Sequence, residues 1–102
     1  MLFEYRACDV DISIRENLDA LNVHEHHKDE YMDYVRIAKK YGVVIVYDNS
    51  ISHHWDYKIY PDIRYGMEQM KMGYCLYSFD TQDEVYGFCY KNELTINEWI
   101  LK

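Results

Sequence analysis

The sequence predicts a single α+β domain over residues 1–102, and two neighbouring segments carry most of that prediction. Residues 29–41 place apolar side chains at helical spacing, and residues 43–59 hold an apolar run, a turn and an alternating run. A helix that leads into two strands is typical of a domain in which helices cover a largely antiparallel sheet. The length of 102 residues is close to the commonest domain size.

Residues 29–41 are predicted to form an amphipathic helix. Acidic residues are concentrated in its first turn and basic residues in its last turn, which suits the helix dipole. Asp29 is the expected N-cap, and Gly42 is expected to end the helix in a left-handed conformation. The apolar side of this helix comprises Tyr31, Tyr34, Val35, Ala38 and Tyr41.

Residues 43–47 (VVIVY) contain no alternation of polar and apolar side chains. A strand of this composition is buried on both faces, so we expect it at the centre of the sheet. Asp48, Asn49 and Ser50 predict a turn, and residues 51–59 alternate as a half-buried strand does. We therefore expect a hairpin whose second strand ends at Pro61.

The remaining segments are assigned from the same periodicities. Alternation of polar and apolar residues predicts strands, and apolar spacings of three and four predict short helices. We expect strands at residues 2–7, 74–80 and 84–90 and helices at residues 14–21, 61–73 and 96–100. The resulting sheet has four to five strands, is mainly antiparallel and carries about three helices on one face.

The composition is that of an ordinary globular protein. With 49% hydrophobic and 28% charged residues the chain is unlike a disordered one. The sequence has no apolar run close to the about 20 residues of a membrane span, and the N-terminus lacks a signal-peptide pattern. Three cysteines without a CxxC pair predict reduced, buried thiols. We therefore expect a cytoplasmic protein that does not associate with membranes.

The net charge is −7 and is unevenly distributed, since residues 1–33 hold nine acidic and three basic side chains. Such a chain repels nucleic acid, so we expect no direct nucleic acid binding. The partners that suit it are basic, for example a protein groove that normally holds nucleic acid. The alternative explanation is that the acidity only keeps a small protein soluble.

The five histidines fall into two clusters, at residues 24–27 and 53–54. Imidazole and carboxylate groups are ligands of transition metals, but the spacing matches no dedicated metal motif. The expectation is therefore no metal and no cofactor. The alternative is a metal site formed by His24, His26 and His54, drawn from the His24/His26/His27 and His53/His54 clusters, with Glu25 or Asp56.

The sequence contains no signature of nucleophilic catalysis. Glycines do not flank Ser50 or Ser52, and the four glycines are scattered singly, which excludes a glycine-rich phosphate loop. The cysteines have aromatic neighbours, which favours inert thiols over thiols with a lowered pKa. We therefore expect no enzyme activity.

The twelve tyrosines are a second feature of the composition. Exposed tyrosines are favoured at protein interfaces, although codon usage in an AT-rich genome also explains their number. Carboxylates one helical turn apart, such as Asp29 and Asp33, lie about 6 Å from each other. That spacing is comparable to the spacing of phosphates on a nucleic acid strand. The combination resembles, in physical type only, the anti-restriction and anti-CRISPR inhibitors of phages, because no motif of those families aligns.

Residues 16–21 (ENLDAL) resemble a short run in barstar-type ribonuclease inhibitors. The resemblance covers six residues, and the preceding Tyr-Gly and following Trp-Asp of that family are absent here. We assign it to chance and infer neither a fold nor a function from it.

The leading hypothesis is a small non-enzymatic inhibitor or adaptor that docks on a basic, nucleic-acid-binding surface of another protein. The first alternative is a small metal-dependent hydrolase or nuclease that uses the histidine clusters. The second is a subunit that forms a homodimer through a strand edge or its tyrosines. The expected contact residues of the leading hypothesis are Glu16, Asp19, Asp29, Glu30, Asp33, Tyr60 and Tyr65.

Overall fold

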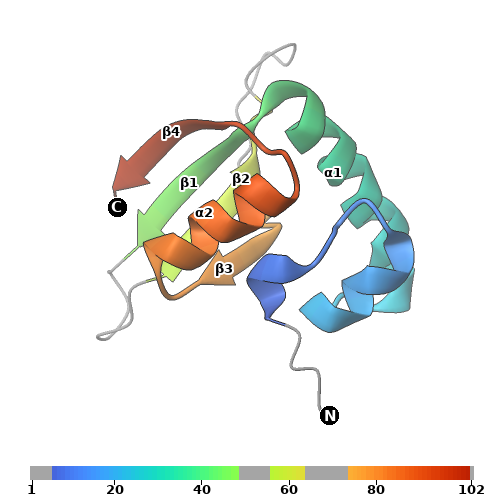
Figure 1. The fold of residues 1–102 in the computed structure, drawn as a ribbon. Helices are drawn as coiled ribbons and strands as arrows, with labels where there is room; N and C mark the ends of the chain where they lie inside the picture. The colour runs from blue at the N-terminus through green and yellow to red at the C-terminus, as the bar shows by residue number, and fades with distance from the viewer. Residues whose placement is uncertain (1–5, 49–55, 64–73, 102) are drawn as a thin grey trace.

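The computed structural model describes residues 6–48, 56–63 and 74–101 (Figure 1). The N-terminal part consists of the 3-10 helices η1 (Ala7–Asp9), η2 (Arg15–Leu21) and η3 (Glu25–His27), followed by helix α1 (Lys28–Tyr41). The rest consists of strands β1 (Val43–Asp48), β2 (Asp56–Pro61) and β3 (Tyr77–Phe79), helix α2 (Gln82–Lys91) and strand β4 (Ile96–Leu101).

The four strands form one mixed sheet in the order β3-β2-β1-β4. Strand β1 pairs antiparallel with β2 and parallel with β4, and β2 pairs antiparallel with β3. The predicted α+β class and the hairpin of β1 and β2 are confirmed. The pairing of β1 with β4 makes the sheet mixed, because the chain returns from the β3 edge through α2 and enters β4 alongside β1 (Figure 1).

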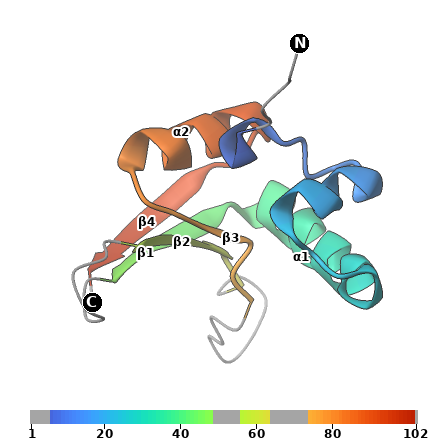
Figure 2. The same cartoon turned by 90° about the horizontal axis from the view of Figure 1, so that it is seen from below.

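Strand β1 lies at the centre of the sheet, as its composition predicts. Residues 43–46 are all buried, so both faces of the strand are covered. Val43 and Ile45 belong to the same core cluster as Tyr31 and Val35 of α1 and Phe88 of α2. Figure 2 shows α2 and the N-terminal segment stacked over one face of the sheet. Each fully buried side chain of this size stabilises the fold by about 1.5–3 kcal/mol.

Asn92, just after α2, holds the N-terminal segment in place. Its side chain is buried, and its Oδ1 accepts a hydrogen bond of 2.8 Å from the backbone N–H of Ile12. Its Nδ2 donates to the backbone carbonyls of Val10 at 2.9 Å and Phe88 at 3.0 Å. The Phe88 carbonyl also accepts from the backbone N–H of Asn92, so the side-chain amide is the partner on which the N–H of Ile12 and the carbonyl of Val10 depend.

Gly42 connects α1 to β1 with φ +94° and ψ −171°, which strongly favours glycine. A Cβ at this position would lie 2.6 Å from Asn97 Nδ2 and 2.7 Å from the carbonyl oxygen of Thr95. Asn97 in turn donates to the carbonyl of Tyr41 at 2.6 Å and to Asp62 Oδ2 at 2.9 Å. Glycine ends the helix as predicted, but its ψ of −171° differs from that of the expected left-handed cap, and the close approach of β4 explains the need for glycine.

The helices predicted at residues 14–21 and 29–41 are present but differ in type or in their first residue. The short helix predicted at 14–21 is a 3-10 helix that ends at Asn22 in the left-handed conformation. Helix α1 begins at Lys28 with His27 as its N-cap residue, so Asp29 lies inside its first turn and is not the cap. Within the described part of the chain, no helix is long and apolar enough to cross a membrane.

The strand predicted at residues 84–90 is wrong, because these residues belong to α2. Thr81 is its N-cap and accepts a hydrogen bond from the backbone N–H of Glu84, while its hydroxyl donates to the Glu84 carboxylate at 2.8 Å. Val85, Phe88 and Cys89 are buried at helical spacing. The aromatic and β-branched residues of this segment are typical of strands, which explains the wrong prediction. The capping contacts of Thr81 with Glu84 favour the helix instead.

The helix predicted at residues 96–100 is also wrong, because they form β4. This strand occupies the edge of the sheet beside β1, where parallel pairing satisfies its backbone. Three further predictions concern residues outside the described ranges. They are the first strand as far as residue 5, residues 64–73 of the helix predicted at 61–73, and the start of the second strand at residues 51–55. Ala7, at the end of the first of these, lies in η1. The described start of the helix predicted at 61–73 is not helical, because Pro61 belongs to β2.

Candidate functional site

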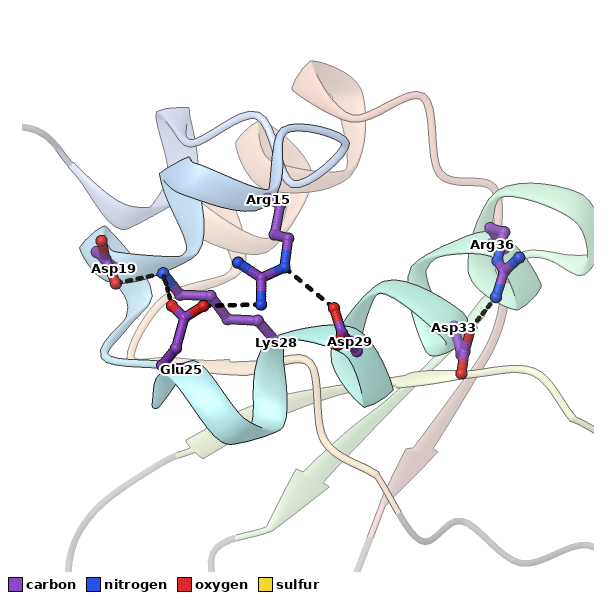
Figure 3. A network of polar contacts seen from close by, with 7 residues as sticks. All are labelled: Arg15, Asp19, Glu25, Lys28, Asp29, Asp33 and Arg36. Carbon is purple, nitrogen blue, oxygen red and sulfur yellow. Dashed lines mark hydrogen bonds and ion pairs between the residues drawn. The ribbon is translucent and has the colours of Figure 1, made fainter.

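Lys28, the first residue of α1, lies at the centre of the acidic region that the sequence singled out (Figure 3). Its side chain is only 4% exposed, and its Nζ lies 2.7 Å from Asp19 Oδ1 and 3.0 Å from Glu25 Oε2. Asp19 and Glu25 come from η2 and η3, so the ammonium group joins three consecutive elements. The two carboxylates remain largely exposed.

Arg15 extends this network on the other side of Glu25 (Figure 3). Its guanidinium lies 2.8 Å from Glu25 Oε1 through Nη2, and its Nε donates to Asp29 Oδ1 at 3.1 Å. Further along α1, Asp33 forms an ion pair with Arg36. The two cations of the Arg15–Lys28 network therefore compensate two of its three carboxylates.

The pKa values of these groups follow from their hydrogen bonds. The carboxylates of Asp19 and Glu25 raise the pKa of Lys28, and those of Glu25 and Asp29 raise the pKa of Arg15. The bonds from Lys28 and then Arg15 lower the pKa of Glu25. These shifts favour the charged forms of Lys28, Arg15 and Glu25, each of which has an opposite charge beside it.

The predicted contact residues consequently have different environments. Asp19, Asp29 and Asp33 are occupied by basic side chains of the same chain, so a partner would have to compete for them. Glu30 lies 3.8 Å from His27, and Glu16 is exposed on η2. Of the two tyrosines, Tyr60 is half-buried on β2, and Tyr65 lies outside the described residues. Their role in partner binding stays a prediction.

The rings of His24, His26 and His27 lie together, with centroids between 4.1 and 6.4 Å apart. In the described ranges, however, no group of three His, Cys, Asp or Glu side chains has an arrangement suited to a metal ion. His53 and His54 lie outside those ranges. The alternative metal site with His54 therefore stays a prediction.

The three cysteines are free thiols. Burial raises the pKa of Cys89 to about 12 and also raises the pKa of Cys75, whose environment includes hydrogen bonds that oppose the shift. Thiols with raised pKa values are poor nucleophiles at neutral pH. Cys75 and Cys89 therefore have the properties of structural thiols.

The exposed tyrosines of α2 form a surface together with β4, a combination that the sequence did not predict. Tyr86 and Tyr90 lie one turn apart on α2, and they are 51% and 89% exposed. Trp99 and Leu101 of β4 are 38% and 74% exposed, and the rings of Tyr86 and Trp99 are 5.6 Å apart. We call these four side chains the α2–β4 face. The combination was not predicted because its two elements were predicted with the opposite secondary structures.

Beside the α2–β4 face, aromatic rings line a depression where β1, β2 and β4 meet the start of α2. Tyr47 and Tyr57 are cross-strand partners with stacked rings 4.5 Å apart, and Trp99 meets Tyr57 edge to face at 6.2 Å. Burial and the neighbouring Tyr57 raise the pKa of Tyr47. The side chains of Asp80 and Asp83 border the same region and are exposed. Aromatic and acidic groups therefore meet at one corner of the sheet.

Comparison with known proteins adds no relative to this description. No protein-family model, curated protein or solved structure matches the chain.

Proposed function

We propose that this protein is a non-enzymatic binding protein that docks on a basic surface of another protein and acts as an inhibitor there. The observation that carries the proposal is the α2–β4 face, in which four large apolar side chains are exposed on two elements that meet at the Tyr86–Trp99 contact. Tyrosine and tryptophan are the residues most enriched where protein interfaces concentrate their binding energy. A monomeric protein has little reason to expose such a group of side chains.

Charge supports a basic partner. The chain carries a net charge of −7, and Asp80 and Asp83 lie at the corner of the sheet beside this face. Such a field accelerates the encounter with a positively charged surface and repels nucleic acid. Basic surfaces of this kind are typical of proteins that handle nucleic acid. We therefore propose a nuclease or another nucleic-acid-binding protein as the partner.

The Arg15–Lys28 network supports placing the contact on the α2–β4 face and not on α1. Its carboxylates are compensated by Arg15 and Lys28, so a partner gains little by replacing those cations. At carboxylates that face solvent, exchange of one cation for another gains little free energy. The acidic side chains of α1 then act on the partner only at long range.

The experiment is capture of basic proteins from a lysate, followed by titration of each purified captured protein with the wild type and two variants. We expect Tyr90→Ser/Leu101→Ser to weaken binding at least tenfold, and Ile14→Ser, which removes an exposed apolar side chain elsewhere, to change it less than twofold. Binding should weaken as salt rises from 50 to 300 mM, and a DNA fragment should compete for the partner.

Two results would overturn the proposal. One is a partner whose affinity is independent of salt and of the α2–β4 face. The other is about one zinc or manganese ion per purified chain together with hydrolase activity that His24→Ala abolishes, which would favour the metal-dependent alternative. A separate outcome is a homodimer that dissociates in the Tyr90→Ser/Leu101→Ser variant, which would assign the α2–β4 face to self-association instead.

A further inference from the structure

We infer that the depression between the sheet and the start of α2 is a binding site for a guanidinium group, supplied by an arginine side chain of the partner. The inference rests on the proposed function for the source of the arginine. The aromatic lining, the carboxylates and the volume of the depression support the site itself.

Two adjoining hollows make up the depression, with volumes of about 450 and 230 Å³. They share Tyr47, Tyr57 and Gln82, so they are continuous along the aromatic wall. Together they are large enough to hold a side chain and the backbone next to it. The larger is lined by Tyr47, Tyr57, Asp80, Thr81, Gln82 and Asp83, and the smaller by Tyr47, Tyr57, Gln82, Trp99, Ile100 and Leu101.

The aromatic wall suits a cation. Tyr47, Tyr57 and Trp99 supply three ring systems from three adjacent strands, and the arrangement of Tyr57 against Trp99 is nearly perpendicular, at 86°. A cation within about 6 Å of a ring face is attracted by the ring quadrupole, with about 0.5–1 kcal/mol at an exposed site. Rings in differing orientations provide more than one face to a bound group. Strand pairing holds the Tyr47 and Tyr57 backbones, so this part of the wall is preorganised.

Two aspartate side chains give the site a negative charge. Asp80 and Asp83 both line the larger hollow, and no basic side chain is among the described residues that line either hollow. The carboxylate of Glu84 accepts from the Thr81 hydroxyl and takes part in capping the helix. The N-terminus of α2 carries a partial positive charge of about one half, which the acidic side chains of its first turn offset. The two aspartates therefore leave a net negative site.

Arginine fits this combination better than lysine does. A guanidinium is planar, stacks on aromatic rings and binds carboxylates with two parallel hydrogen bonds. A lysine ammonium is strongly hydrated and gains only a point-charge attraction. Since the walls offer both rings and carboxylates, we expect the site to discriminate in favour of arginine.

The test uses the peptide acetyl-Gly-Gly-Arg-Gly-Gly-amide and its lysine and citrulline analogues as probes. Citrulline keeps the planar shape but has no charge. Binding is followed by the fluorescence of Trp99 in a Trp55→Phe variant, which removes the other tryptophan, and by amide NMR shifts. We expect the arginine peptide to bind at least fivefold tighter than the lysine peptide, and the citrulline peptide to show no saturable binding.

Two variants and one control locate the site. Asp80→Asn/Asp83→Asn should weaken binding of the arginine peptide at least tenfold, and Glu16→Gln/Glu93→Gln, which changes the net charge equally at exposed positions, less than twofold. Gln82→Lys places a cation in both hollows and should abolish binding. Circular dichroism checks that each variant is folded, and Gln82→Lys keeps the test decisive if the double aspartate variant is not.

The outcomes separate this inference from the proposed function. Equal weakening by both charge variants, or equal affinity for all three peptides, overturns the arginine site. A basic partner that binds Gln82→Lys as tightly as the wild type overturns it as well and leaves the proposed function in place. Selective binding of the arginine peptide without any basic protein partner supports the site and overturns the proposed function.

Discussion

Lys28 Nζ lies 2.7 Å from Asp19 Oδ1 while the Lys28 side chain is almost completely buried and Asp19 is 76% exposed. A buried lysine side chain thus pairs with carboxylates that face solvent. The aliphatic stem of Lys28 packs inside and its charge reaches Asp19 and Glu25 at the surface, as long basic side chains commonly do. Acidic residues that look like a docking surface in the sequence are therefore also part of what holds η2 and η3 against α1.

Replacing Lys28 tests this structural role. Lys28→Ala removes the buried stem and leaves Asp19 without its cation and Glu25 with Arg15 alone, so we expect Tm to fall by several degrees. Lys28→Met keeps most of the packing and should lower Tm less. Arg36→Ala, which removes the exposed partner of Asp33, is the control and should leave Tm nearly unchanged. Equal changes in all three variants would contradict a role for burial.

The same network predicts how stability depends on pH. Glu25 has a lowered pKa in the folded protein, so its contribution is present above its ordinary value of 4.5 and is lost as pH falls through the folded value. Lys28 has a raised pKa, so its contribution is present below 10.5 and is lost as pH rises through the folded value. Urea unfolding at pH 3, 7 and 11 should show smaller losses at both extremes for Lys28→Met than for wild type. Parallel profiles would show that the network does not contribute.

Gly42 and Gly87 allow a comparison of the effect of an added Cβ at a strained and at an unstrained backbone position. Gly42→Ala forces a side chain into a positive φ and against Asn97 and Thr95, so we expect a loss of about 2 kcal/mol or more. Gly87 lies inside α2 and has room, since the nearest atom to an added Cβ is Cys8 Cβ at 3.8 Å. Gly87→Ala should therefore stabilise the protein by about 0.5–1 kcal/mol through helix propensity. Chemical denaturation measures both, and a loss at Gly87 would contradict the spacing at Cys8.

Asn92→Ala should be among the most destabilising polar substitutions. It leaves the N–H of Ile12 and the carbonyl of Val10 buried without their partner, with an expected loss of about 3 kcal/mol. Hydrogen exchange at the Ile12 amide should accelerate along with the fall in the urea midpoint. Asn17→Ala, which removes one part-buried hydrogen bond to Asp11, should cost less than about 1 kcal/mol. A similar loss in both variants would argue against Asn92 as the anchor of the N-terminal segment.

Local patterns were sufficient for α1, β1 and the hairpin to β2. The helical stripe containing Tyr31 and Val35 and the fully apolar run at 43–47 each follow from a single segment and its own energetics. In these places local propensity and tertiary environment favour the same structure, and such agreement makes a prediction from one sequence succeed.

Residues 84–90 and 96–101 were decided by tertiary contacts. Tyr86 and Phe88 suit a strand or a helix equally well. The capping contacts between Thr81 and Glu84 favour the helix locally, and burial of Val85, Phe88 and Cys89 against the core stabilises it. Ile96–Leu101 becomes a strand because β1 offers an unpaired edge there, a condition that no local spacing reveals.

The candidate sites likewise combine features that the sequence shows with contacts that only the fold creates. The charge and the number of tyrosines could be read from the chain, and they suggested binding to a basic partner. Which carboxylates are compensated depends on Arg15 and Lys28 lying beside residues up to 14 positions away. The meeting of the side chains that line the depression depends on strand order. Pairing of β1 with β2 brings Tyr47 and Tyr57 together, pairing of β2 with β3 places Asp80 near them, and pairing of β1 with β4 adds Trp99. The number of acidic and aromatic residues can be counted in the sequence, whereas which of their side chains lie close together depends on the strand order.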